Sequence, residues 1–325
     1  MRSDLTVELV DQVRYKRERL KDLLPPIPGT PFVFLSPFFV LFGVFLAIPV
    51  FYTIYLSFFV FQGVSMEPIF VLDLGTYQLV VPEMANLRFV GLEHYERMLT
   101  DQVFHQAITN TVVIFVVQMP IMVSLALGLA LVLNAGFTRF KDAFRSVLLL
   151  PVSANTVAYS VIFIVLVTEG GLADAMFRAV GLDPVAWLSN GFWSRNLIAF
   201  MSVWRWTGYN MIIILAGLQT ISDSLYEAAE IDGATKIQKF RYVTLPQLKP
   251  IMLFVFVTST IGGFKKFAEP TIVIQSGAPI TETRTIAYYI YQVAFQNLEL
   301  GYGSALTVAL VVIIMSLSLL QFKVS

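Results

Sequence analysis

The chain has 325 residues, of which 57% are hydrophobic and 14% are charged, and its formal net charge is zero. A soluble domain carries nearer a quarter charged residues, so this composition and a mean hydropathy of +0.73 favour a polytopic membrane protein over a soluble one. The absence of cysteine excludes disulfides and thiolate chemistry, and His94 and His105 do not have metal-ligand spacing, so we expect no metal site.

The N-terminal residues 1–31 are predicted to form a cytoplasmic tail with a Pro-rich linker at its end. The apolar run that follows is about twice as long as that of a signal peptide and has no small-x-small cleavage site, so we expect no cleavage. A charge-free window from Asp22 to Glu67 predicts a first transmembrane helix at 32–60. A modest external loop is expected at 61–104.

Further charge-free windows predict five more transmembrane helices. A span needs about 20 apolar residues, and a charge at mid-bilayer costs several kcal/mol. The expected spans lie at about 108–133, 146–167, 197–217, 250–273 and 303–321. We therefore predict an all-α fold of about six transmembrane helices, with a core domain at 105–321 and a short cytoplasmic end at 322–325.

The distribution of Lys and Arg predicts the orientation of these helices. Basic residues gather in the N-terminal tail, in the loop around Lys141, in the loop at about 222–250 and at Lys323. The opposite side holds fewer of them. By the positive-inside rule, both termini and the loop at about 222–250 are expected in the cytoplasm.

That cytoplasmic loop holds the most informative pattern of the chain. Ser224 and Glu227 have the spacing of a capping box, and Asp232-Gly233 predicts a left-handed turn between two short helices. Small residues at Ala228 and Ala229 would let another protein approach closely. The full pattern consists of Glu227, Ala228, Ala229, Asp232, Gly233, Ala234, Phe240, Leu245, Pro246 and Pro250.

This pattern resembles the EAA loop of the type I ATP-binding cassette importer permeases, in the form found in their sugar-permease branch of the maltose and glycerol-phosphate type. Further similarity runs from about residue 33 to 321, as at Leu148-Leu149-Leu150-Pro151 and Gly301-Tyr302-Gly303. The resemblance implies the type I importer transmembrane fold. It also implies that the loop forms a coupling helix that fits a cleft on the ATPase. An ordinary connecting loop is the alternative, and for Glu227 the alternative is a purely local cap.

The resemblance further implies a permease subunit of a binding-protein-dependent importer for a carbohydrate or polyol, in a bacterial or archaeal cytoplasmic membrane. Its expected partners are a second, similar permease, a dimer of ATPase subunits, an extracytoplasmic solute-binding protein and membrane lipid, but no nucleic acid. The chain has no phosphate-binding G-x-x-x-x-G-K-[ST] loop, so it is not expected to be an enzyme or to bind a cofactor; ATP and Mg are expected on the ATPase. An ATP-independent secondary transporter or channel is the alternative.

Arg205 is the charge that lies well inside a predicted span, about 14 Å from its outer end. An intramembrane arginine is a candidate functional residue. Its neighbours offer the stacking faces and hydrogen bonds that a sugar uses, and they are Trp204, Trp206, Tyr209 and Asn210. The alternative is an arginine bound to a carboxylate or carbonyl between helices.

Lys265, Lys266 and Glu269 depart from the family pattern, because many relatives have a neutral stretch there. Counting from Pro250 places both lysines near the outer interface, where they would reach the headgroups and pair locally with Glu269. The competing hypothesis is that these lysines and Arg205 favour an anionic solute such as a sugar phosphate.

Overall fold

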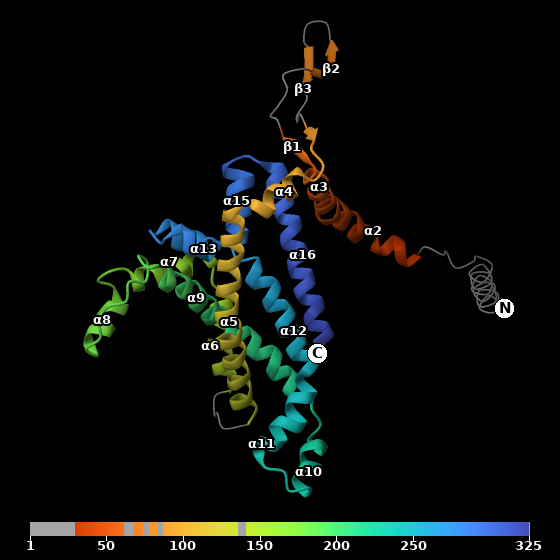
Figure 1. Ribbon diagram of the computed structural model, residues 1–325. Helices are drawn as coiled ribbons and strands as arrows, with labels where there is room; N and C mark the ends of the chain where they lie inside the picture. Colours follow the sequence, from red (N-terminus) through yellow and green to blue (C-terminus); the bar gives the residue numbers. More distant parts are fainter. Residues whose placement is uncertain (1–29, 62–67, 74–77, 83–86, 136–140, 325) are drawn as a thin grey trace, which may run out of the picture. The chain divides into compact units, whose positions relative to one another are not determined.

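The computed structural model describes residues 30–61, 68–73, 78–82, 87–135 and 141–324 (Figure 1). Most of the predicted N-terminal tail, residues 1–29, lies outside the described residues. The chain divides into two units, one that ends at Tyr55 and one that begins at Leu56.

The first unit is a long apolar helix. It consists of α2 (Thr30–Phe42), one π-helical turn (η1, Gly43–Ala47) and α3 (Ile48–Leu56). The segment Phe34–Leu56 is long and apolar enough to cross a membrane. Apolar residues occupy all sides of this helix, with no marked polar face.

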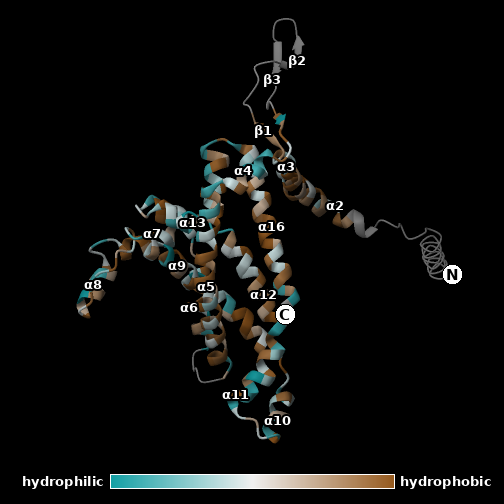
Figure 2. Cartoon of the chain, in the orientation of Figure 1, coloured by the Kyte–Doolittle hydropathy of each residue, from teal (hydrophilic) through white to brown (hydrophobic). Residues whose placement is uncertain are grey.

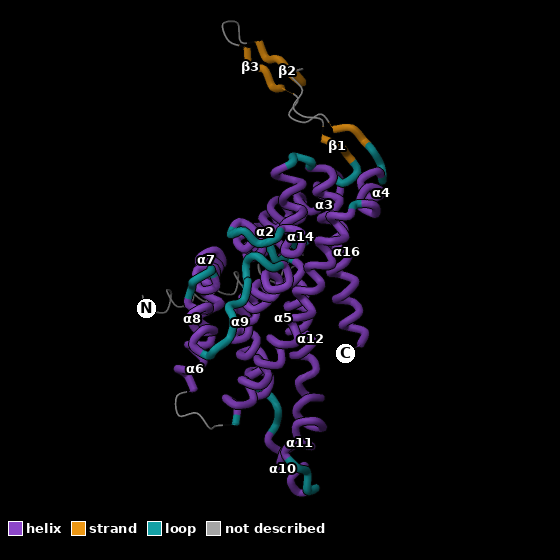
Figure 3. The backbone as a smooth tube through the Cα atoms, turned by 60° about the vertical axis from the view of Figure 1, so that its left-hand side comes forward, coloured by secondary structure: helices purple, strands orange, loops and turns teal. Residues whose placement is uncertain are grey.

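The second unit begins with two small antiparallel sheets in the predicted external loop (Figure 3). Strand β1 (Phe59–Phe61) pairs with β4 (Leu87–Phe89), and β2 (Pro68–Asp73) pairs with β3 (Gln78–Pro82). The amphipathic helix α4 (Glu93–Thr100) follows. These strands are a minor addition to a fold that is otherwise helical.

Helices form the rest of the second unit. In chain order they are α5 (Gln102–Asn134), α6 (Lys141–Ser153), α7 (Thr156–Val167), α8 (Leu172–Ala179), α9 (Gly191–Leu218), α10 (Asp223–Ile231), α11 (Lys236–Lys239), η2 (Phe240–Thr244), α12 (Leu245–Phe264), α13 (Ala268–Gln275), α14 (Ile280–Thr283), α15 (Ile286–Tyr291), η3 (Gln292–Gln296) and α16 (Leu300–Val324). The predicted all-α membrane fold is confirmed.

Five segments of the described residues are long and apolar enough to cross a membrane, and they include α5, α7, α12 and α16 (Figure 2). The predicted fourth span forms the 28-residue helix α9, which is long enough but more polar. Helix α9 packs along α5 and buries polar side chains such as Ser202, Thr207 and Asn210. Polar residues within a membrane face the bundle interior, which explains how α9 carries them.

Two of the predicted spans are broken, so the expectation of one continuous helix was wrong for each. The span at 146–167 divides at Ala154-Asn155, where Asn155 leaves the helix and caps α7 by accepting hydrogen bonds from the N–H groups of Val157 and Ala158. The span at 250–273 divides after Phe264, and α13 begins at Ala268. Charge-free windows do not detect such breaks, because they register hydrophobicity and not caps.

Helices α6 and α9 approach each other closely at Gly208. A Cβ atom at this position would lie 1.7 Å from the carbonyl oxygen of Leu148. Only glycine fits there, so this contact fixes the distance between the two helices.

A hydrogen-bonded cluster ties the start of α5 to α15 and α16. Asp101 caps α5, and its Oδ2 atom accepts hydrogen bonds from the hydroxyls of Tyr289 at 2.5 Å and Tyr302 at 2.6 Å. Burial acts to raise the pKa of the Asp101 carboxyl. The bonds from both tyrosines and from backbone N–H groups outweigh burial and hold that pKa below its usual value.

Candidate coupling loop and substrate path

The loop at 222–250 contains α10, a tight turn and α11, and it continues through η2 into the start of α12. Gly233 has φ of +74°, a left-handed conformation that glycine adopts without strain. The N–H of Ala234 donates to the carbonyl of Ala229 at 2.9 Å, which closes the C-terminus of α10. The predicted left-handed turn at Asp232-Gly233 is confirmed.

The predicted capping box between Ser224 and Glu227 was wrong. Helix α10 has Ser222 at its N-cap, without a side-chain cap bond, and Ser224 lies in the first turn with its hydroxyl 2.8 Å from that of Ser222. A capping box does form at the next helix, where Thr235 and Gln238 satisfy each other's backbone N–H groups. This second capping box was not predicted from the sequence.

An ion pair joins the two helices across the turn. Lys239 of α11 pairs with Glu230 of α10. The pKa of Glu230 lies below its usual value because Lys239 donates a hydrogen bond to its carboxylate and adds electrostatic attraction. The hydroxyls of Tyr226 and Thr244 lie 3.0 Å apart and connect α10 to η2.

The surface of this loop is more apolar than the motif predicted. Ile231 is 87% exposed and Ile237 is 78% exposed, and Tyr242 is also exposed. Glu227 and Ala228 are exposed as well. In the sequence, Ile231 and Ile237 are isolated large apolar residues within a polar loop. This pattern could have predicted that they form an exposed apolar surface. Pro246 lies at the start of α12, directly after the π-helical turn η2, and Pro250 lies one turn further on.

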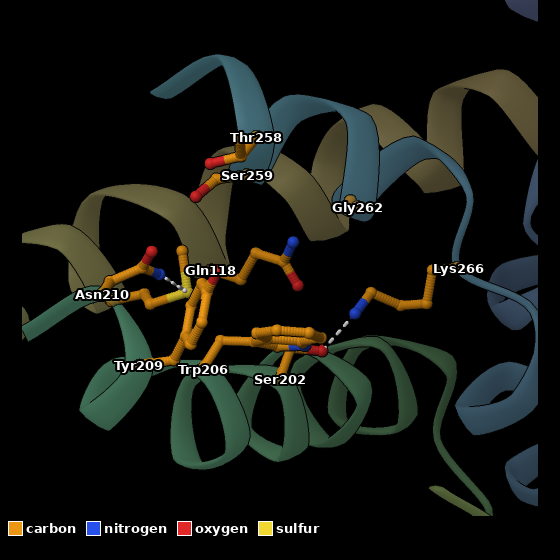
Figure 4. A pocket seen from close by; sticks show the side chains of 11 residues that line it. Gln118, Ser202, Trp206, Tyr209, Asn210, Thr258, Ser259, Gly262 and Lys266 are labelled. Atoms are coloured by element: carbon orange, nitrogen blue, oxygen red, sulfur yellow. Dashed lines mark hydrogen bonds between the residues drawn. The ribbon is translucent and has the colours of Figure 1, made fainter. Parts of the chain in front are cut away.

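A small cavity of about 80 Å³ lies between α5, α9 and α12 (Figure 4). Four of the predicted substrate-path residues line it, namely Trp206, Tyr209, Asn210 and Lys266. The rings of Trp206 and Tyr209 contact each other edge to face, with centroids 5.7 Å apart. The site therefore combines aromatic faces with amide, hydroxyl and ammonium groups.

Lys266 is buried and does not extend to the headgroups, so that part of the interpretation was wrong, but its predicted pairing with Glu269 is confirmed. Its side chain is buried, and its Nζ atom donates a hydrogen bond to the hydroxyl of Ser202 (Figure 4). The carboxylate of Glu269 lies 3.9 Å from the same Nζ atom. Helix α12 ends before Lys266, and the chain turns this residue inward while Lys265 stays exposed.

Arg205 lies outside the cavity lining and joins α9 to α7. It donates a hydrogen bond to the hydroxyl of Thr156, and its guanidinium lies 4.9 Å from the ring centre of Tyr159. The Tyr159 hydroxyl donates to Glu269 at 2.6 Å. Trp204 packs on the rings of Tyr159 and Phe163. Arg205, Trp204 and Glu269 thus all contact Tyr159, and of these three residues only Glu269 is buried.

Other residues of the lining were missed by the sequence search. Gln118 and Met122 come from α5, and Thr258 and Ser259 come from α12. The Oε1 atom of Gln118 is buried without a partner among the described residues. Gln118 is a polar residue within a long apolar helix. This pattern in the sequence could have marked it as a candidate for the cavity lining.

The fold and this site define a polytopic membrane permease. The family model of the binding-protein-dependent transport system inner membrane component matches residues 124–324. The chain belongs to this family, the permease subunits of ATP-binding cassette importers. It is therefore a multi-pass inner-membrane component, and ATP is bound and hydrolysed by a separate ATPase subunit. This assignment decides against the ATP-independent alternative.

Known relatives cover nearly the whole chain. It is 36% identical to the lactose transport system permease protein of Rhizobium radiobacter, over 89% of this chain and 92% of that protein. It is 32% identical to the arabinooligosaccharides transport system permease protein of Bacillus subtilis, over 95% of this chain and 93% of that protein. A chain of the crystal structure of a bacterial alginate transporter with its periplasmic protein has a TM-score of 0.71 at 21% identity, over 89% of this chain and 91% of that chain, and shares the fold.

Proposed function

We propose that this permease carries a carbohydrate or a related polyol and forms half of the translocation pathway. The relatives named for lactose and for arabinooligosaccharides support this solute class. The observation that carries the proposal is the cavity between α5, α9 and α12, where Trp206 and Tyr209 offer ring faces beside the amide of Asn210. Sugars bind to such combinations of aromatic surface and hydrogen-bonding groups.

A second permease completes the path. Ligand cavities generally measure about 300–1,000 Å³, and the cavity in this chain is smaller, at about 80 Å³. A sugar therefore needs space that a homologous partner or a conformational change supplies. Two ATPase subunits on the cytoplasmic side and an extracytoplasmic solute-binding protein complete the importer in a bacterial or archaeal membrane, with both termini in the cytoplasm.

The solute is neutral in this proposal. Of Arg205, Lys265 and Lys266, only Lys266 lines the cavity. The Glu269 carboxylate lies beside its ammonium group. Arg205 is directed to Thr156. The charge balance thus gives little support to the hypothesis of an anionic solute.

The loop at 222–250 couples this path to the ATPase. Glu227 and Asp232 supply polar contacts, Ala228 and Ala229 permit close approach, and Gly233 sets the turn. When ATP closes the ATPase dimer, the docked loops move together and the helices change between inward- and outward-facing states. The domain arrangement proposed here is an N-terminal tail at 1–31, a first span at 32–60, an external loop at 61–104 and the permease core at 105–321.

Uptake by the whole importer in proteoliposomes tests this proposal. The complex, with its solute-binding protein outside and ATP inside, is expected to accumulate radiolabelled lactose or arabinotriose but not glycerol phosphate. Accumulation of glycerol phosphate alone would contradict the neutral carbohydrate class. Accumulation without ATP would contradict the coupling.

A further inference from the structure

An apolar groove of about 370 Å³ lies between α5 and α9, two helices that pack along each other (Figure 1). Helix α5 lines it with Val117, Ile121 and Leu125, which follow one another at intervals of four residues and so share one face of the helix. Helix α9 lines it with residues from Phe192 to Val203, all of them aliphatic or aromatic except one asparagine. Ile121, Leu125 and Phe192 are exposed, so the groove opens on the surface of the second unit.

The length and place of this groove match one leaflet of a bilayer. Helix α5 is one of the segments that are long and apolar enough to cross a membrane. From Phe192 to Val203 the groove follows α9 for about 16 Å. One leaflet contributes about 15 Å to a hydrocarbon core that is about 30 Å thick. A lipid acyl chain therefore has both the polarity and the reach to fill the groove.

Aromatic rings mark one end of the groove. The rings of Trp187 and Trp193 lie 5.4 Å apart, and the ring of Phe192 lies 5.2 Å from that of Trp193. Tryptophan is enriched where a membrane meets water. This end lies at the start of α9, where the sequence predicts the outer face of the membrane, so it is at the level of the lipid headgroups.

Arg195 brings a positive charge to the same end. It lines a small pocket of about 60 Å³ that shares Val117, Phe192 and Asn196 with the groove, so the two spaces adjoin. Arg195 is partly exposed, and its Nη1 atom donates a long hydrogen bond of 3.4 Å to the Oδ1 atom of Asn110. It forms no ion pair with any residue that the structure describes. The groove thus ends beside a cation that lacks a counter-ion.

We propose that this groove binds an anionic glycerophospholipid of the outer leaflet. One acyl chain lies along Ile121, Leu125 and Phe200, and the phosphate accepts hydrogen bonds from the guanidinium of Arg195. Guanidinium groups suit this role because they form strong, charge-assisted bonds to phosphate oxygens. An uncharged apolar helix would also fill the groove, but it would leave Arg195 without a partner. The inference does not depend on which solute the permease carries.

Native mass spectrometry of the intact importer, titrated with equal amounts of phosphatidylglycerol and phosphatidylcholine, tests the headgroup contact. Native protein is expected to retain phosphatidylglycerol in preference, and Arg195→Gln should lower the ratio of the two bound lipids about fivefold. Ile121→Trp fills the groove and should lower the binding of both lipids. The matched controls are Val116→Trp, at an exposed position of α5 outside the groove, and Arg178→Gln, an exposed arginine outside both pockets. Both should bind lipid as native protein does.

Photo-crosslinking from the groove identifies its occupant. With benzoylphenylalanine in place of Phe200, irradiation of the importer in native membranes is expected to capture a phospholipid. Capture of the second permease, or of another part of this chain, would make the groove a protein contact and overturn the inference. A ratio of bound lipids that Arg195→Gln changes no more than Arg178→Gln does would also overturn it, because the site would then not select an anionic headgroup.

Discussion

Lys239 of α11 and Glu230 of α10 form an ion pair that spans the turn at Gly233. The pair joins the two helices of the proposed coupling loop. Both residues lie outside the motif that identified the loop, so this contact is a feature that the structure adds to the motif.

Glu230→Gln should loosen α11. Without the ion pair, hydrogen exchange of residues 236–244 is expected to rise by a few-fold, because exposed pairs contribute little. The pKa of Glu230 is lowered, so the pair is complete above the usual pKa of glutamate and is lost as pH falls through the lowered value. The hydrogen exchange of native protein and variant should therefore differ at pH 7 and converge as the pH falls below the lowered pKa of Glu230. Asp223→Asn, in the same helix, is the control; an equal effect there would contradict the role of the pair.

Lys266→Met should damage both stability and uptake. The change leaves the Glu269 carboxylate buried without its cation, which typically costs about 3–5 kcal/mol. Thermal unfolding, followed by size-exclusion chromatography, is expected to show a clear loss of thermal stability. The exposed Lys265→Met should have little effect, and Lys266→Met with Glu269→Gln should recover part of the loss. Equal effects of the two lysine substitutions would refute the buried arrangement.

Gly208→Val should prevent the close contact of α6 and α9. Its side chain would overlap the Leu148 carbonyl, and such overpacking costs about 1–3 kcal/mol or more. The measurement is the yield and melting temperature of the purified importer. Gly128→Ala, where no atom lies within 4 Å of the added Cβ, should leave both unchanged.

Asp101→Ala should destabilise the junction of α5, α15 and α16. It removes an N-cap, worth about 0.5–2 kcal/mol, and the acceptor of two tyrosine hydroxyls. Because the pKa of Asp101 is lowered, its carboxylate stabilises the fold above the usual pKa of aspartate, and this stabilisation fades as pH falls through the lowered value. Asp101→Asn keeps the cap without titrating, so its melting temperature should vary less than that of native protein below about pH 4.

Hydrophobicity and charge were sufficient to predict the membrane fold, because they report on burial in lipid. They could not predict the breaks at Asn155 and after Phe264, which depend on a cap and on a turn that brings Lys266 inward. Counting residues along an assumed helix therefore placed Lys266 at the interface. The Gly233 turn was predictable because its glycine requirement is local.

The partner of Arg205 was beyond sequence reasoning. Thr156 and Arg205 lie 49 residues apart and meet only because α7 packs near α9. Long-range contacts of this kind carry no periodic signal.

Solute-stimulated ATP turnover of the purified importer in nanodiscs, compared between native protein and Gly233→Val, tests the central claim most directly. A β-branched side chain in the left-handed turn costs roughly 1–2 kcal/mol and should displace α11 from the ATPase. The account predicts that the variant keeps its membrane fold and loses ATPase association or stimulated turnover. Turnover equal to that of native protein, with the same amount of ATPase bound, would contradict coupling through this loop.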